Sequence, residues 1–372
     1  MSTRDTSSLS TPFNPDPSIS HLNESLEGIP RYLFRVSDPS ALGITTETEV
    51  CSEAARISPE HLRDLYQLPS QQAAQLLNTH LWGNCSDSGL DRCNLVSWTS
   101  SLLVALQLGF FCHGRSWNPQ ELSEIKVLVI DTRQFDSRVF ARDLQAIAAF
   151  KDESEVGTKL RLLYEWRSSG RFYPAEYLSQ GKLIISPEKS CQVSMQELVN
   201  RGIRNVCSGL GNDAHWDTWA IRIRNLRTEL KSQSPPIRST EVQAAINVAK
   251  AFGHFEIPGV IMLLSLTPCD LSSGGAAIVE MLLGAYSKQA VIRHVSFPWF
   301  IPGADSERLP ELERWRVLSD RIGRHLTLNI DQLALNIDQL RRESEGGDSG
   351  HGQADDLASG FAGLAIQSDD VS

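Results

Sequence analysis

The feature that most restricts what this chain can fold into is a short, uninterrupted apolar segment, Lys126-Val127-Leu128-Val129-Ile130. Its β-branched residues predict a strand, and its lack of polar alternation predicts that both faces of this strand are buried. Such a strand lies inside a sheet that is covered on both sides. The surrounding sequence predicts further strands at 31–36, 94–97, 176–178 and 182–185 and helices at 69–82, 100–106, 138–151 and 157–167. We therefore predict a mixed α/β fold.

After about residue 190 the sequence pattern changes from strands to helices. Apolar residues recur at helical spacing from Trp216 to Leu230, and Thr240 with Gln243 forms a capping box that opens the next helix. Two more apolar helices are expected at 257–266 and 276–286. A mostly helical region is therefore expected to follow the α/β domain.

The two ends of the sequence differ from its middle. Residues 1–28 are rich in Ser, Thr, Pro and Asn and show no hydrophobic period, so they are expected to be disordered. Residues 343–372 contain seven acidic residues and no Lys or Arg, which predicts a disordered acidic tail. The expected organisation is a disordered segment at 1–28, an α/β domain at 29–192, a helical domain at 193–342 and the tail at 343–372.

Composition argues against several classes of function. The formal charge is −10, and it falls to −3 when the seven acids of the tail are left out (−10 + 7), so no nucleic-acid partner is expected. Seven cysteines at irregular spacing predict reduced thiols and no metal site. The N-terminus lacks the apolar core of a secretory signal, and the longest apolar run, 260–266, is too short to cross a bilayer. We expect a cytoplasmic or nuclear protein that is not secreted and contacts no membrane.

Polar residues at three predicted strand positions are candidates for a functional site. Arg35 lies in the otherwise apolar first strand, Ser97 and Thr99 fall on one face of an extended segment, and Glu176 starts a later strand. Together they would supply an anion clamp, a pair of hydroxyls and a single carboxylate. Each also has a simpler explanation: Arg35 as an ion-pair partner, the serines after residue 96 as a helix cap, and Glu176 as a solvated carboxylate.

Four stretches of the chain carry a resemblance to known families: R-Y-L-F-R-V at 31–36, L-V-S-W-T-S-S-L-L-V-A-L at 95–106, V-I-D-T at 129–132 and E-Y-L-S-Q-G at 176–181. Through them the segment from about 29 to 192 resembles a domain of unknown function that is common in filamentous fungi. The order of the polar residues is in turn similar to that of the arginine–serine–glutamate class of ADP-ribosyltransferases, as in bacterial toxins of the cholera and pertussis type.

The second resemblance implies a split-sheet, ADP-ribosyltransferase-like domain that uses NAD as its substrate. In that family an arginine on the first strand holds NAD, a serine–threonine–serine strand braces the nicotinamide side, and a later glutamate contacts the nicotinamide ribose. Arg35, Ser97 with Thr99, and Glu176 would take these roles here, with transfer to an unknown protein acceptor or to water. Pro174 stands where arginine-modifying transferases carry a second Glu or Gln, so arginine modification is not expected. The alternative is a non-catalytic pseudoenzyme that serves as a protein-interaction module.

Two patterns near the C-terminus suggest partners. A seven-residue sequence at 328–334 is repeated almost completely at 335–340, which favours a helix that packs on a partner helix. The spacing of four apolar residues in the tail is that of a leucine-rich nuclear export signal, which would bind a nuclear export receptor as an amphipathic helix. These residues are Leu357, Phe361, Leu364 and Ile366.

Overall fold

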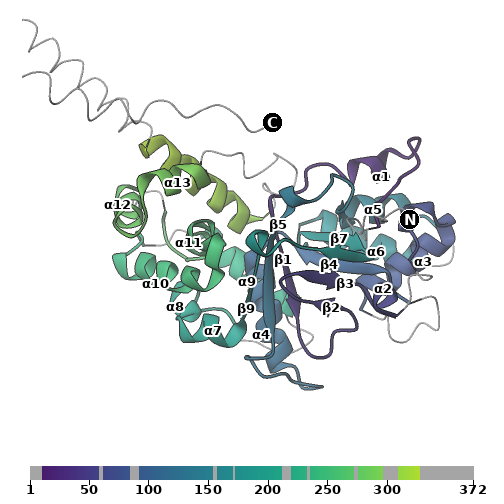
Figure 1. Ribbon diagram of the computed structural model, residues 1–372, viewed down its shortest axis with the longest axis horizontal. Coiled ribbons are helices and arrows are strands. Elements are labelled where there is room, and N and C mark those ends of the chain that lie inside the picture. The colour runs from purple at the N-terminus through teal and green to yellow at the C-terminus, as the bar shows by residue number, and fades with distance from the viewer. Residues whose placement is uncertain are drawn as a thin grey trace, which may run out of the picture. The chain divides into compact units, whose positions relative to one another are not determined.

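A computed structural model describes residues 11–57, 62–83, 92–153, 157–170, 172–211, 219–232, 235–271, 275–295 and 309–326 (Figure 1). Residues 1–323 form one compact unit, and residues 324–372 form a second unit of which only 324–326 are described. The heptad repeat at 328–340, the predicted export signal at 357–366 and the acidic tail lie outside the described residues.

A six-stranded antiparallel sheet lies at the centre of the first unit, in the order β6-β7-β4-β1-β5-β9. Its strands are β1 (Tyr32–Ser37), β4 (Leu95–Thr99), β5 (Lys126–Asp131), β6 (Ala141–Arg142), β7 (Glu176–Gln180) and β9 (Ser190–Ser194). The apolar segment that begins at Lys126 is confirmed as β5, and every residue of β5 after Lys126 is buried. It lies between β1 and β9, which pair with its two edges. Its apolar side chains point to the two faces of the sheet, where other layers bury them.

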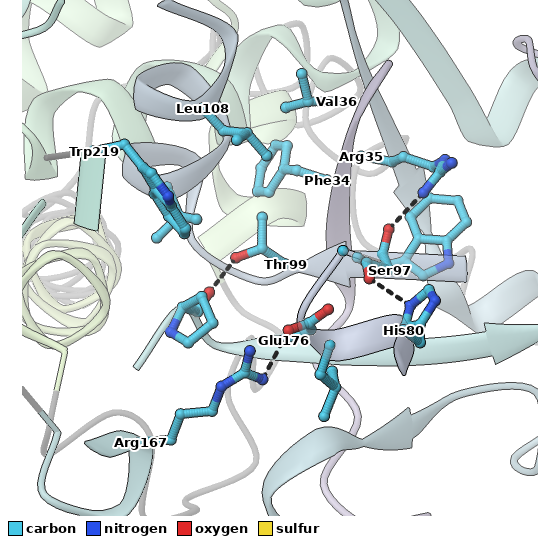
Figure 2. Close-up of a pocket in the computed structure, with 15 residues that line it drawn as sticks. Phe34, Arg35, Val36, His80, Ser97, Thr99, Leu108, Arg167, Glu176 and Trp219 are labelled. Atoms are coloured by element: carbon cyan, nitrogen blue, oxygen red, sulfur yellow. Dashed lines mark hydrogen bonds and ion pairs between the residues drawn. The ribbon is translucent and has the colours of Figure 1, made fainter. Parts of the chain in front are cut away.

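The strand β1 pairs very differently with its two neighbours. All six residues of β1 pair with β5, whereas β1 pairs with β4 only where Phe34 lies opposite Thr99. Past this position β1 and β4 separate, and Figure 2 shows them running in different directions. β4 pairs with β7 along its whole length, which ends with Thr99 opposite Glu176. The sheet is therefore open between two of its central strands, beside Arg35.

A small second sheet covers one face of the main sheet. It has three antiparallel strands, β2 (Ile44–Thr45), β3 (Glu49–Cys51) and β8 (Lys182–Ile184), in the order β2-β3-β8. Val50 and Leu183 from this small sheet pack with Leu33, Trp98 and Tyr177 from the main sheet. These contacts bury Leu33, the residue of β1 that packs against the small sheet.

Helices cover the opposite face of the main sheet in two groups (Figure 1). The first group packs around Leu95 and Leu178 and contains α1 (Ser20–Glu24), α3 (Ser70–Leu81), α5 (Asp143–Phe150) and α6 (Gly157–Ser168). The second begins with α4 (Leu102–Gly114), which packs on β1 and β5. The predicted serine cap of α4 is confirmed, because Ser101 Oγ accepts a hydrogen bond from Val104 N at 3.3 Å.

The described residues after β9 form helices and no named strand, as the periodicity of this part of the sequence predicts. Its elements are α7 (Met195–Asn200), α8 (Ile203–Val206), α9 (Trp219–Lys231), α10 (Ser239–Ala249), η5 (Lys250–Phe255), α11 (Glu256–Ser265), α12 (Gly275–Ala285), α13 (Lys288–Val295) and a helix that begins at residue 310. The shorter elements of the first half are α2 (Glu53–Ile57), η2 (Leu65–Gln67), η3 (Thr132–Gln134) and η4 (Pro187–Lys189). The predicted domain boundary after residue 192 falls inside β9, and the division into domains stays a prediction.

One helical segment, Ser239–Ser265, is long and apolar enough to meet the criteria for a membrane span. However, 72% of its most apolar stretch is buried inside the protein, as in a core helix. The segment is also interrupted at Gly253, whose φ of 50° and ψ of −116° are not helical and suit a residue without a Cβ. Its apolar character is thus explained by packing between α10, α11 and their neighbours.

The prediction of disorder for residues 1–28 is wrong for residues 11–28. Phe13 and Leu22 are almost fully buried in the same core as α3 and α5, and the ring of Phe13 lies 4.9 Å from that of Tyr66. Phe13 N also donates a hydrogen bond to Arg138 O at 2.9 Å. The segment is polar on average, but two buried apolar side chains are sufficient to anchor it, and a composition average does not detect them.

Candidate functional site

The opening between β1 and β4 contains a pocket with a volume of about 260 Å³ (Figure 2). Its walls come from three strands of the main sheet and from α3, α4, α6 and α9. The lining residues are Phe34, Arg35, Val36, His80, Leu81, Gly83, Ser97, Trp98, Thr99, Val104, Leu108, Arg167, Pro174, Glu176 and Trp219. All four residues that the sequence proposed, Arg35, Ser97, Thr99 and Glu176, are therefore in one place.

The pairing of the strands explains why these residues meet. Phe34, Thr99 and Glu176 lie opposite one another across β1, β4 and β7, and directly opposed residues of antiparallel strands share a face. Ser97 shares this face too, because it is two residues before Thr99. Three segments that are far apart in the sequence thus present a hydroxyl, a carboxylate and an aromatic ring to the same space.

Arg35 brings a positive charge to the pocket. Its Nε donates to Thr45 Oγ1 at 2.9 Å, and its Nη1 donates across the opening to Ser97 O at 2.9 Å. In the part of the chain that the structure describes, no carboxylate lies within 4 Å of its guanidinium, so its charge is not neutralised by an ion pair there. Burial lowers the pKa of Arg35 to about 10, which leaves it cationic at neutral pH. A half-buried cation of this kind favours an anionic ligand.

Glu176 is held by Arg167 at the opposite side of the pocket. Arg167 Nη1 lies 2.7 Å from Glu176 Oε2 and also contacts Asp143 Oδ2. The three side chains are 13% (Glu176), 8% (Arg167) and 0% (Asp143) exposed. Burial alone would lower the pKa of Arg167, but its ion pairs with Asp143 and Glu176 raise it well above its usual range. Arg167 orients one oxygen of Glu176, and among the described residues none donates to the other, Oε1.

The hydroxyl of Thr99 positions the chain just before Glu176 instead of facing a ligand. Thr99 Oγ1 donates to Pro174 O at 2.7 Å and accepts from Ser101 N at 3.0 Å. Next to Pro174, Ala175 has a φ of 53°, which is unfavourable for a residue with a Cβ. Its carbonyl accepts a hydrogen bond from Ser100 N at 3.1 Å. Thr99 and Ser100, at the end of β4, therefore hold the strained backbone at Ala175. This backbone places Glu176 in the pocket.

Ser97 belongs to a chain of hydrogen-bonding groups that runs from the pocket into the core. Its hydroxyl lies 2.8 Å from His80 Nε2, and His80 Nδ1 lies 3.1 Å from the sulfur of Cys93. His80 comes from the last turn of α3, and it lines the pocket itself. When the imidazole carries its proton on Nδ1, Nε2 accepts from the Ser97 hydroxyl. That arrangement fixes the orientation of Ser97 and offers it a base.

Trp98, which separates Ser97 from Thr99 in the sequence, is explained by the opposite face of β4. Its indole is 2% exposed, packs edge-on against Phe140 with 5.8 Å between ring centroids, and donates to Ser179 Oγ at 2.9 Å. Trp98 is thus a core residue beneath the pocket. On the pocket side, Trp219 and Phe34 supply aromatic surface (Figure 2).

Three residues that contribute to the chemistry of this pocket were not among the predicted site residues: His80, Arg167 and Trp219. The available signal for Arg167 was its spacing from Leu160 and Leu163, which puts a charged residue on the buried face of α6. Trp219 was assigned to a helix face, and no pattern in the sequence marks His80.

No group of three or more His, Cys, Asp or Glu that could hold a metal ion occurs within the described ranges. The cysteines that the structure describes are all free thiols, at positions 51, 93, 112, 191, 207 and 269.

The groups that line the pocket are a cation, a carboxylate, a hydroxyl bonded to an imidazole, and aromatic surface. Such a set suits a ligand that combines a negative charge, a centre of developing positive charge and a planar ring.

Comparison with known proteins adds one finding. No curated protein and no solved structure matches this chain. Residues 28–183 match the model of a protein family, and that segment contains every strand that lines the pocket. The expected similarity of this part of the chain to a domain of unknown function is thereby confirmed: the model that residues 28–183 match is described as Domain of unknown function (DUF7587).

Proposed function

We propose that the pocket between β1 and β4 binds the nicotinamide–ribose end of NAD and that the protein is an NAD-dependent ADP-ribosyltransferase or NAD glycohydrolase. One observation carries this proposal: Arg35, Ser97 and Glu176, chosen from the sequence for their order on strands, line the same pocket. The cation at Arg35, which has no carboxylate neighbour among the described residues, supports an anionic ligand such as a pyrophosphate.

The reaction would use the carboxylate of Glu176. When the bond between nicotinamide nitrogen and ribose C1′ breaks, its electron pair leaves with nicotinamide and C1′ gains oxocarbenium character. A fixed carboxylate beside the ribose stabilises that charge as it develops. The oxygen of water, or of an acceptor side chain, then forms the new bond to C1′ and gives up its proton to the solvent. Glu176 Oε1 is the oxygen available for this role, because Oε2 is paired with Arg167.

The ion pair between Glu176 and Arg167 also favours a second candidate function. Arg167 Nη1 lies 2.7 Å from Glu176 Oε2 and partly neutralises the carboxylate that would stabilise the transition state. A protein that binds NAD without cleaving it, or a pseudoenzyme that serves as an interaction module, would tolerate this pair well. Pro174 at the pocket edge gives no second carboxylate or amide for an arginine acceptor, so the proposed acceptor is water or a side chain other than arginine.

The test compares the wild type with Glu176→Gln, which keeps the shape of the side chain but removes its charge. NAD binding is measured by calorimetry, and turnover is measured as nicotinamide release. Glu188→Gln, an exposed position in η4, is the matched control. We expect Glu176→Gln to retain NAD binding and to lose nicotinamide release by at least about a hundredfold, the size typical for loss of one transition-state group. Binding without turnover in the wild type would select the pseudoenzyme, and the absence of binding at millimolar NAD would refute the proposal.

A further inference from the structure

We propose that an aromatic cluster beside the pocket, formed by Trp82, Trp166, Phe172 and Arg224, binds the adenine nucleotide half of the same ligand. This inference rests on the proposed function, since it assigns a place to the part of NAD that lies outside the pocket. Trp82 and Trp166 are 37% and 42% exposed, although each is a large apolar side chain. Their ring centroids are 6.0 Å apart in an edge-on arrangement.

The cluster continues the rim of the pocket along four separate segments of the chain. Trp82 lies between Leu81 and Gly83, which line the pocket, and Trp166 precedes Arg167, which lines it too. Phe172 is two residues before Pro174 at the pocket edge, and its ring centroid is 6.3 Å from that of Trp166. Since these neighbours are part of the pocket, a ligand that leaves the pocket on this side meets the aromatic cluster.

The size of the pocket requires such an extension. Pockets for drug-sized ligands have about 300–1,000 Å³, and a dinucleotide is at least as large as these ligands. The volume of about 260 Å³ between β1 and β4 holds only one end of it. The adenine nucleotide of NAD must therefore lie outside, on a surface that can bind a base and a phosphate.

The residues of the cluster have the chemistry for both groups. Exposed tryptophan rings are stacking surfaces for a purine base. The guanidinium of Arg224 lies 5.7 Å from the ring centroid of Phe172, and within the described residues no carboxylate is within 4 Å of it. Arg224 thus lies beside Phe172, whose ring is next to that of Trp166, and among the described residues no carboxylate neutralises its charge. This arrangement matches a phosphate near a stacked base.

The test measures the binding of three probes, NAD, ADP-ribose and nicotinamide mononucleotide, by calorimetry on the full chain. The variants are Trp82→Ala and Trp166→Ala, each with its Phe variant, which keeps a ring and shows that the protein still folds. Trp117→Ala is the control, because Trp117 is 47% exposed and does not belong to the cluster. We expect either alanine variant to weaken NAD and ADP-ribose binding by about 5- to 150-fold and to leave nicotinamide mononucleotide unchanged, with partial recovery in the Phe variants.

The outcomes separate this inference from the proposed function. In one outcome, nicotinamide mononucleotide binds the wild type, and the affinity for ADP-ribose is the same in the wild type and in both alanine variants. This result would overturn the inference and keep the proposed function. In another outcome, ADP-ribose binding weakens in both alanine variants, but nicotinamide mononucleotide does not bind the wild type. This result would support adenine binding at the cluster and count against nicotinamide binding in the pocket. If none of the probes binds the wild type, both ideas fail.

Discussion

Replacing Glu311 by alanine is expected to destabilise the protein far more than any single change on its surface. Glu311 is 1% exposed, and its Oε1 accepts hydrogen bonds from Arg227 Nη2 at 2.8 Å and from Ser101 Oγ at 2.7 Å. Arg227 Nη1 in turn donates to Tyr173 O at 2.6 Å. The carboxylate thus connects α9 and the helix that begins at residue 310 to the cap of α4 and to the segment before Glu176.

The magnitude follows from the burial of both charges. Arg227 is only 6% exposed, so the alanine variant leaves a buried guanidinium whose main counter-charge is gone. Removing one partner of such a pair costs about 3–5 kcal/mol, because the remaining charge keeps its desolvation penalty without the compensating attraction. Replacing both partners, as in Arg227→Met with Glu311→Leu, removes the charges together and is expected to recover most of the loss.

The assay is urea unfolding followed by circular dichroism, with the shift in free energy taken from the transition midpoint. Glu313→Ala is the matched control, since Glu313 lies on the same helix and pairs with Arg316, but its side chain is 41% exposed. An exposed pair of this kind contributes less than about 1 kcal/mol. A loss for Glu311→Ala no larger than that for Glu313→Ala would refute the reasoning, and so would a double variant whose loss equals the sum of the single losses.

Two further predictions concern the N-terminal segment and the acid stability of the protein. Phe13→Ala should lower the free energy of unfolding by about 3–5 kcal/mol, because it empties a fully buried aromatic site, whereas a disordered segment would show no change in the same urea assay. Burial and the nearby charges of Arg31 and Arg293 lower the pKa of His294 to about 4. In the unfolded chain this histidine takes up a proton near pH 6.5, so the folded state loses about 2 kcal/mol as the pH falls from 6.5 towards 4. His294→Gln should flatten stability across this pH range, and an unchanged pH profile would contradict the assignment.

Much of the candidate site was predictable from local sequence. Arg35, Ser97 and Glu176 were selected because each is a polar residue in or beside a strand, and the strands β1, β4 and β7 exist where the pattern places them. The role of Thr99 was not predictable in the same way. Its hydroxyl bonds to Pro174 O, and this contact depends on how β4 and β7 pair and on the turn that joins β7 to the preceding segment.

The residues that complete the pocket depend on packing between distant segments. His80 reaches Ser97 because α3 packs over β4, and Arg167 reaches Glu176 because α6 lies against the same end of the sheet. In the sequence these residues are ordinary members of amphipathic helices. They lie at the site because of where α3 and α6 pack on the sheet, and the local periodicity of a helix does not specify where it packs.

The sequence alone determined which segments are strands and helices, since alternation, helical spacing and capping residues act between neighbours in the chain. It placed β5 in the interior of the sheet and a capped helix after Ser101. The tertiary structure decided that β1 and β4 pair only at Phe34 and Thr99, that the gap becomes a pocket, and that residues 11–28 join the core. The physical reason is that strand register and apolar burial are settled by contacts between segments far apart in the chain, where the total area buried outweighs the preferences of each segment by itself.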